Sequence, residues 1–185
     1  MEYHCKYFEV LASKLADYTE KCTVSFMDLY RNTERNVKTL NIVKDTYEMQ
    51  VELLQRFVEI AKEHGLYIDT CAEIGDFHNI GVEHAHCIDR ERIERIGEFK
   101  LSVDKDTNQR AECGCVASID IGAYNTCKNG CLYCYANYSS NTVEKNFVMH
   151  NPKSPLLFGE IDDTDVIKER KVKSLIDNQM NLFDI

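Results

Sequence analysis

The sequence predicts an α/β protein with a partial, (β/α) barrel-like parallel sheet, an irregular cysteine-rich segment and a C-terminal helix. Short runs of β-branched and aromatic residues alternate with amphipathic helical patterns, which is typical of parallel β/α units. Glycine marks where this regularity ends: residues 1–64 contain neither glycine nor proline, whereas six of the eight glycines lie between Gly75 and Gly130. We therefore expect three segments: β/α units over 1–104, a cysteine-rich segment over 105–150, and an extended link, helix and tail over 151–185.

The elements of the first segment follow one another in a regular order. Apolar residues at helical spacing predict a helix near residues 3–20, and the β-branched and aromatic run 23–27 predicts a buried strand. A second apolar stripe over 53–61 predicts a helix that ends at Gly65, because glycine enters the left-handed conformation without steric cost. Residues 66–70 then form the second strand. Strands separated by helices pair in parallel with right-handed crossovers.

Two strands do not make a complete sheet of this kind. A closed (β/α) barrel takes about 250 residues, whereas this chain has 185 and opens directly on a helix. We expect the chain to correspond to the C-terminal part of a longer architecture, or to pair with an upstream portion of the same barrel.

Composition and charge exclude several classes of protein. The chain carries 22 Lys and Arg against 31 Asp and Glu, a net charge of −9, which argues against broad electrostatic binding of nucleic acid or anionic membranes. No apolar run approaches the roughly 20 residues of a membrane span, and the N-terminus lacks the pattern of a signal peptide. We expect a cytoplasmic protein without a membrane partner. In that reducing compartment nine cysteines favour metal binding or redox chemistry over disulfides.

The strongest motif is a C-x3-C-x2-C run formed by Cys127, Cys131 and Cys134. Gly130 permits a sharp turn, so three thiols can converge from one loop onto one centre. Thiolates are soft ligands that suit iron–sulfur clusters or zinc. A cubane [4Fe–4S] cluster normally takes four cysteines, so three would leave one iron open. The alternative is three buried cysteines that act as small hydrophobes, but their close spacing favours metal.

The motif, with the aromatic Tyr133 before its last cysteine, resembles the signature of radical S-adenosylmethionine (SAM) enzymes. In that family the open iron of the [4Fe–4S] cluster chelates the amino and carboxylate groups of SAM, and an electron from the cluster cleaves the sulfonium to a 5′-deoxyadenosyl radical. The wider pattern resembles an uncharacterised microbial family, the domain of unknown function 1848 family, whose C-terminal cysteine cluster is similar to the one that radical SAM enzymes carry near their N-terminus. The residues that carry this resemblance are 25–30, 71–73, 108–110, 113–115, 120–122 and 135–137.

Two hypotheses for the function follow. In the first, the chain is a radical SAM-like iron–sulfur protein, and an enzyme, with an unknown substrate. In the second, the cysteines hold zinc or an electron-transfer cluster in a non-catalytic module. The second stays open because few residues follow Cys134 and they contain no Gly-Gly-Glu-like segment of the kind that binds the SAM amino group.

A second set of four cysteines is scattered along the chain: Cys71, Cys87, Cys113 and Cys115. Four is the number of ligands that a second iron–sulfur cluster or a structural zinc ion requires. The alternative is two core cysteines and a partial site, because spacing so irregular needs the fold to bring the thiols together.

Polar residues follow both predicted strands at their carboxyl ends, where ligands bind in parallel α/β folds. Asp28 and Tyr30 lie beyond the first strand, and Glu73 and Asp76 beyond the second. All four are candidate contacts to substrate or SAM, and Asp28, Tyr30 and Glu73 are also candidate catalytic residues. The alternative for each is a solvated loop side chain or a capping residue.

The tail carries two further predictions. Residues 163–165 offer N-caps for a helix that contains Ile176. Near the end, Gln179, Leu182 and Phe183 resemble the short peptide by which bacterial DNA-processing proteins bind the replication sliding clamp. Leu182 and Phe183 would be pocket anchors and Gln179 a hydrogen-bonding group. The tail would then tether an accessory of DNA processing, or else fold back on the core.

Overall fold

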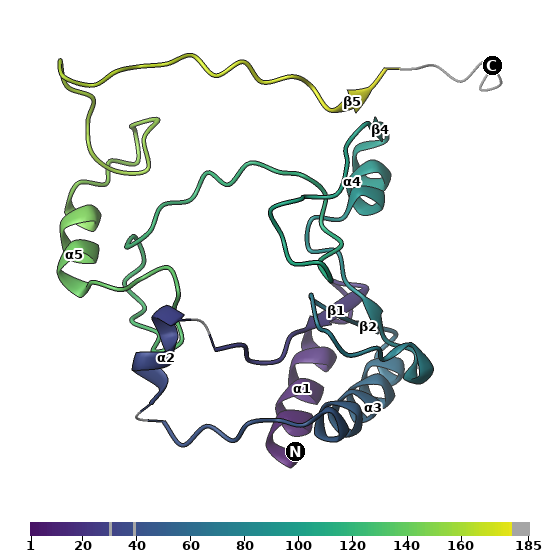
Figure 1. The fold of residues 1–185 in the computed structure, drawn as a ribbon. Helices are drawn as coiled ribbons and strands as arrows, with labels where there is room; N and C mark the ends of the chain where they lie inside the picture. Colours follow the sequence, from purple (N-terminus) through teal and green to yellow (C-terminus); the bar gives the residue numbers. More distant parts are fainter. Residues whose placement is uncertain (30, 39, 179–185) are drawn as a thin grey trace. The chain divides into compact units, whose positions relative to one another are not determined.

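A computed structural model describes residues 1–29, 31–38 and 40–178, which form two compact units. The first unit comprises Met1–Met27, Lys44–Ser118 and the described residues from Ser174, and the second comprises Asp28–Val43 and Ile119–Lys173. The first unit contains α1 (Glu2–Leu15), β1 (Lys21–Val24), α3 (Tyr47–Glu63), β2 (Tyr67–Thr70), the 3-10 helix η1 (His78–Ile80), β3 (Glu83–His84), α4 (Arg90–Gly97), β4 (Lys100–Leu101) and β5 (Ile176–Asp177) (Figure 1). The second contains α2 (Arg31–Val37) and α5 (Ser140–Val148).

The first unit is built on a parallel sheet with the strand order β1-β2-β3. Cys22 of β1 lies opposite Ile68 of β2, and Asp69 of β2 lies opposite Glu83 of β3. The prediction of an α/β protein with a parallel sheet is confirmed. Within the described part of the chain this sheet stays open, and no closed barrel forms.

Helices α1 and α3 lie side by side and supply most of the core of this unit (Figure 1). Phe8 of α1 stacks on Phe57 of α3 with their ring centroids 4.3 Å apart, and Leu54 of α3 is fully buried. Burying a side chain of this size contributes about 1.5–3 kcal/mol. Ile68 of β2 joins the same cluster, so this face of the sheet carries the helices.

Helix α3 begins and ends as its sequence dictates. The Thr46 hydroxyl accepts a hydrogen bond from the Met49 amide at 3.4 Å, which satisfies one of the donors at the start of the helix. At the other end Gly65 has a φ of +69°, the left-handed conformation expected of a glycine that follows a helix. The predicted end of the helix is therefore confirmed.

A buried ion pair joins β1 to β2. Lys21 Nζ lies 2.6 Å from Asp69 Oδ2, and their side chains are only 12% and 6% exposed. Side chains alternate along a strand, so Asp69 points away from the face that Ile68 packs against the helices. The other carboxylate oxygen, Asp69 Oδ1, is buried and has no hydrogen-bond partner among the residues that the structure describes. Removing either partner would leave an uncompensated buried charge, which is strongly destabilising.

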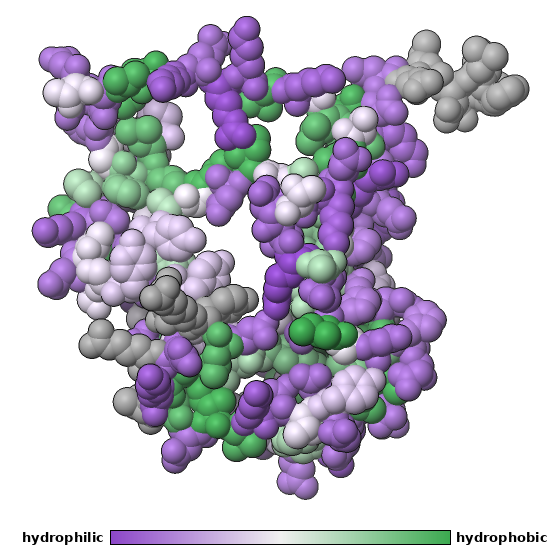
Figure 2. Space-filling model, in the orientation of Figure 1, coloured by the Kyte–Doolittle hydropathy of each residue, from purple (hydrophilic) through white to green (hydrophobic). Residues whose placement is uncertain are grey.

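The predicted tail helix is wrong. From Val166 on, the described tail is extended chain (yellow in Figure 1), and its only regular element is β5, which pairs antiparallel with β4. The Ser102 amide donates to the Leu175 carbonyl at 2.8 Å and continues this pairing. Val166 and Val172 are 79% and 69% exposed, so these residues do not form the buried apolar face that a helix would need, and the run is mostly hydrophilic on the face drawn in Figure 2. A helix this short is marginal without a packed face.

The second unit has a small and mainly polar interior. Among its described residues, the buried ones are Thr33, Val37, Asn125, Val143 and Asn146. So little apolar burial leaves this unit dependent on hydrogen bonds or on a bound group for its stability.

Candidate metal centres

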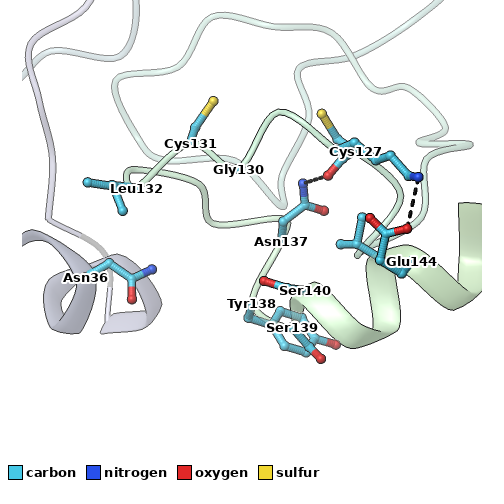
Figure 3. Close-up of a pocket in the computed structure, with 12 residues that line it drawn as sticks. Asn36, Cys127, Gly130, Cys131, Leu132, Asn137, Tyr138, Ser139, Ser140 and Glu144 are labelled. Atoms are coloured by element: carbon cyan, nitrogen blue, oxygen red, sulfur yellow. Dashed lines mark hydrogen bonds and ion pairs between the residues drawn. The ribbon is translucent and has the colours of Figure 1, made fainter.

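The C-x3-C-x2-C motif lies in the second unit, on the loop that precedes α5. Gly130 turns this loop with a φ of +64°. Cys127 and Cys131 are exposed and Cys134 is partly buried, and all three are free thiols. In Figure 3 the sulfur atoms of Cys127 and Cys131 point to the same side of the loop, away from α5. The loop therefore presents at least two soft donor atoms in one direction.

A cavity of about 290 Å³ borders this loop. Cys127, Cys131 and Leu132 line it from the loop, Asn36 from α2 and Glu144 from α5 (Figure 3). This volume is at the lower end of the range of roughly 300–1,000 Å³ typical of small-molecule sites. Two residues of the motif thus border room for a small ligand, while their sulfur atoms point away from α5.

The wall of the cavity also holds both signs of charge. Lys128 Nζ lies 3.0 Å from Glu144 Oε2 and 3.7 Å from the centroid of the Phe147 ring. This ion pair is largely exposed, so it adds little stability. It places an ammonium and a carboxylate beside the thiols.

Asn125 holds the two ends of the cysteine loop together. Its side-chain oxygen accepts hydrogen bonds from the amides of Tyr138 and Ser139 at 3.0 and 3.1 Å. The backbone amide of Asn125 donates to the Ala136 carbonyl at 2.9 Å, and its backbone carbonyl accepts from Asn146 Nδ2 at 3.0 Å. Asn125 is only 3% exposed and has a φ of +57°.

Sequence reasoning missed Asn125. The available signal was an asparagine two residues before the first cysteine, since asparagine tolerates the left-handed conformation and bonds nearby backbone amides. A further bond inside the loop, from Asn137 Nδ2 to the Cys127 carbonyl at 2.8 Å, fixes the first cysteine (Figure 3).

Tyr133 and Asp28 meet in the second unit. The Tyr133 hydroxyl donates a hydrogen bond to the backbone carbonyl of Asp28. The contact uses the backbone of Asp28 and not its carboxylate, so a catalytic role for that carboxylate stays a prediction. Tyr30 lies outside the described residues.

Glu73 and Asp76 lie in the first unit, after β2. Glu73 Oε1 accepts from the Phe26 amide at 2.8 Å and from Ser25 Oγ at 3.2 Å, which ties the segment after β1 to the segment after β2. Asp76 Oδ1 accepts from the His78 amide at 2.9 Å. Both carboxylates therefore make local structural bonds, and their contact with a substrate or SAM stays a prediction.

The four scattered cysteines all lie in the first unit and contact one another. Cys71 and Cys87 have their sulfur atoms 3.2 Å apart. Cys113 and Cys115 are buried and pack with Ala72, and Cys71 packs against them. We call these four residues the rim cysteines, because Cys71 directly follows the carboxyl end of β2.

The surroundings of the rim cysteines raise the pKa of two of the thiols. Partial burial of the sulfur, its hydrogen bond with Cys71 and the nearby thiols raise the pKa of Cys87 to about 12. Burial raises the pKa of Cys113 above its ordinary value; a backbone hydrogen bond with Cys115 opposes this shift, and the thiols of Cys115 and Cys71 add to it. Neighbouring thiols raise a pKa because two thiolates repel each other. A bound cation reverses this balance by pairing with the thiolates.

Neither set of cysteines already surrounds an ion. Among the described residues, no group of three or more His, Cys, Asp or Glu side chains is arranged to hold a metal. The chemistry of both sets nevertheless fits a soft metal, because every donor is a thiol. The residues Gln179, Leu182 and Phe183 of the predicted clamp peptide lie outside the described part of the chain.

The fold and its thiols define an α/β protein with an open parallel sheet and a cysteine-rich loop. The model of one family, described as Domain of unknown function (DUF1848), matches residues 1–136. The chain belongs to this family, as the sequence predicted, and the match includes every cysteine of the chain. Curated proteins and solved structures give no match. In the part of the chain that the structure describes, no helix has the length and apolarity to cross a membrane.

Proposed function

We propose that this chain is an iron–sulfur protein in which Cys127, Cys131 and Cys134 hold a [4Fe–4S] cluster that leaves one iron free to bind SAM. The observation that carries the proposal is the loop that presents Cys127 and Cys131 on one side, beside a cavity that both residues line. Three thiolates leave one iron without a protein ligand. Such a cluster, when bound and reduced, supplies the electron for reductive cleavage of SAM.

The residues of the second unit would have two tasks in this function. Asn125 and Asn137 hold the loop that carries the thiols, through hydrogen bonds to its backbone. Lys128 and Glu144 place opposite charges on the cavity wall, which suits a zwitterionic ligand such as the amino acid part of SAM. The three thiols would come together around the metal as it binds, as ligands do in small metal-folded domains.

Anaerobic reconstitution with iron and sulfide tests this function. We expect the wild-type chain to take up a cluster whose electron paramagnetic resonance spectrum, after reduction, changes on addition of SAM. Cys131→Ser should lose that spectrum. Cys5→Ser is the matched control, because Cys5 is a partly buried cysteine of α1 outside both sets. A reduced cluster whose spectrum ignores SAM would refute SAM binding.

The small polar interior of the second unit favours a second candidate function, a non-catalytic metal module. A zinc ion or an electron-transfer cluster on the same three cysteines would then stabilise this unit without reacting with SAM. The same preparation distinguishes the two candidates. Stoichiometric zinc bound through Cys127, Cys131 and Cys134, with no uptake of iron, would support the module and contradict the radical SAM function.

A further inference from the structure

We propose that the four rim cysteines, Cys71, Cys87, Cys113 and Cys115, bind a single metal ion through four thiolates, Zn²⁺ or Fe²⁺, at a site separate from the Cys127 loop. They come from three segments: the end of β2, the segment after β3, and the C-x-C at 113–115. Four thiolates complete a tetrahedral shell, so this site would be structural and would have no open position.

The distance within the first pair favours one ion over a cluster. The Cys71 and Cys87 sulfur atoms lie 3.2 Å apart. Two thiolates on one tetrahedral zinc ion, each about 2.3 Å from the metal, lie about 3.8 Å apart. A small outward movement therefore admits the ion. In a cubane cluster each cysteine binds a different iron, so the sulfur atoms must lie further apart.

The second pair, the buried Cys113 and Cys115, packs against one member of the first, Cys71. None of these donors yet surrounds an ion in the described chain, so binding must draw the C-x-C and the Cys71–Cys87 pair together. Both pairs are thiols only, which is the donor set of structural four-cysteine sites.

Hydrogen bonds from backbone amides already join two of the three segments, the one after β3 and the C-x-C. The Ile88 amide donates to Cys115 Sγ at 3.3 Å, and the Val116 amide donates to the Ile88 carbonyl at 3.2 Å. An amide aimed at a cysteine sulfur is the kind of outer contact that orients a metal ligand. Ala72, next to Cys71, has a φ of +52°, an uncommon conformation for a residue other than glycine. Such strain is maintained only where the surrounding structure imposes it.

A metal ion would explain how the segment from 102 to 118 keeps its place. In this segment the structure assigns one isolated bridge, Lys105 to Val116, and neither a helix nor a strand. A thiolate link to β2 would anchor it across a long separation along the chain. The alternative chemistry for the same distance is a disulfide between Cys71 and Cys87, which would leave Cys113 and Cys115 free.

The test uses the full chain with Cys127, Cys131 and Cys134 all replaced by serine, so that the proposed function contributes no metal. Failure of one proposal therefore leaves the other untouched. The metal-free protein is titrated with Co²⁺, Zn²⁺ and Fe²⁺, the last with and without sulfide. We expect one ion per chain, the charge-transfer absorption of tetrahedral cobalt thiolate, and displacement of cobalt by zinc. Iron uptake should be one per chain and should not need sulfide.

Two variants and one control make the result specific. Cys87→Ser should weaken binding of the ion by about 100-fold or more, and because Cys87 is exposed this change leaves no buried gap. Cys113→Ser with Cys115→Ser should abolish binding. Cys5→Ser, added to the same triple-serine chain, should bind the ion as tightly as that chain does without it. Far-UV circular dichroism of each metal-free variant checks that α1 and α3 remain folded.

Four results would overturn the proposal. If the chain with Cys127, Cys131 and Cys134 replaced by serine binds no ion, the rim cysteines form no such site. Equal loss of binding in Cys5→Ser and Cys87→Ser would mean that binding is not specific to the rim cysteines. Uptake of several irons only with sulfide would replace the single ion by a cluster. A Cys71–Cys87 cross-link in protein purified without reductant, seen as a mass lower by two hydrogens and persisting with zinc present, would assign the pair to a disulfide.

Discussion

Replacing Asn125 should loosen the cysteine loop by an amount that its contacts set. Its side-chain oxygen is the acceptor for the amides of Tyr138 and Ser139. Leaving a buried donor unsatisfied costs about 1–3 kcal/mol, and because these amides are only partly buried, we take about 1 kcal/mol for each. Asn125→Gly should therefore cost about 2 kcal/mol. Asn125→Ala should cost about 1 kcal/mol more than Asn125→Gly, since at a φ of +57° alanine has the Cβ that glycine lacks, without the polar side chain that lets asparagine tolerate this conformation.

Hydrogen exchange measures this change at the amides concerned. Because 1.4 kcal/mol is a factor of about ten, exchange at Tyr138 and Ser139 should accelerate about 30-fold in Asn125→Gly and about 100-fold in Asn125→Ala. Asn125→Asp keeps an acceptor oxygen and tolerates the same backbone, so it serves as the control and should exchange nearly as the wild type does. Wild-type exchange rates in both Gly and Ala variants would refute the role of Asn125. Equal rates in these two variants would refute the backbone contribution alone.

Three other predictions concern separate parts of the chain. Gly65→Ala should lower the free energy of unfolding by about 1 kcal/mol in urea titrations, because Gly65 has a φ of +69°. A Cβ at this position meets no described atom within 4 Å, so the loss would come from the backbone conformation and not from a clash. An unchanged unfolding midpoint would contradict this. Hydrogen bonds from the Leu101 amide and Lys100 hold the pKa of Glu94 below its ordinary 4.5. The stability that these bonds provide is therefore present above pH 4.5 and is lost as the pH falls below that value. Glu94→Gln should therefore flatten the acid side of the stability profile, and a profile as steep as the wild type's would argue against it. Cys131→Ala should leave the helical circular dichroism unchanged and make residues 105–140 more sensitive to protease, whereas equal resistance in a metal-loaded wild type would count against metal-dependent folding.

Local rules were sufficient for α1, α3 and the pairing of β1 with β2 in the first unit, whereas they predicted neither α4 nor β3. Apolar spacing predicted α1 and α3, and Gly65 predicted where α3 ends, because both signals act within a few residues. Alternation of strands and helices predicted parallel pairing, which β1 and β2 confirm. The tail helix was predicted by the same local rules and was wrong, because its apolar residues find no face to pack on.

The sequence identifies one of the two cysteine sets, and only the tertiary structure brings the other together. The sequence by itself determined that Cys127, Cys131 and Cys134 share one loop, since chain connectivity keeps residues this close in sequence near each other in any fold. It could name the rim cysteines only as a hypothesis. Their contact spans segments far apart along the chain, and only the packing of the C-x-C against the end of β2 brings them together. Asn125 belongs to the same category, because its importance depends on bonds to Tyr138 and Ser139, whose positions the tertiary structure decides.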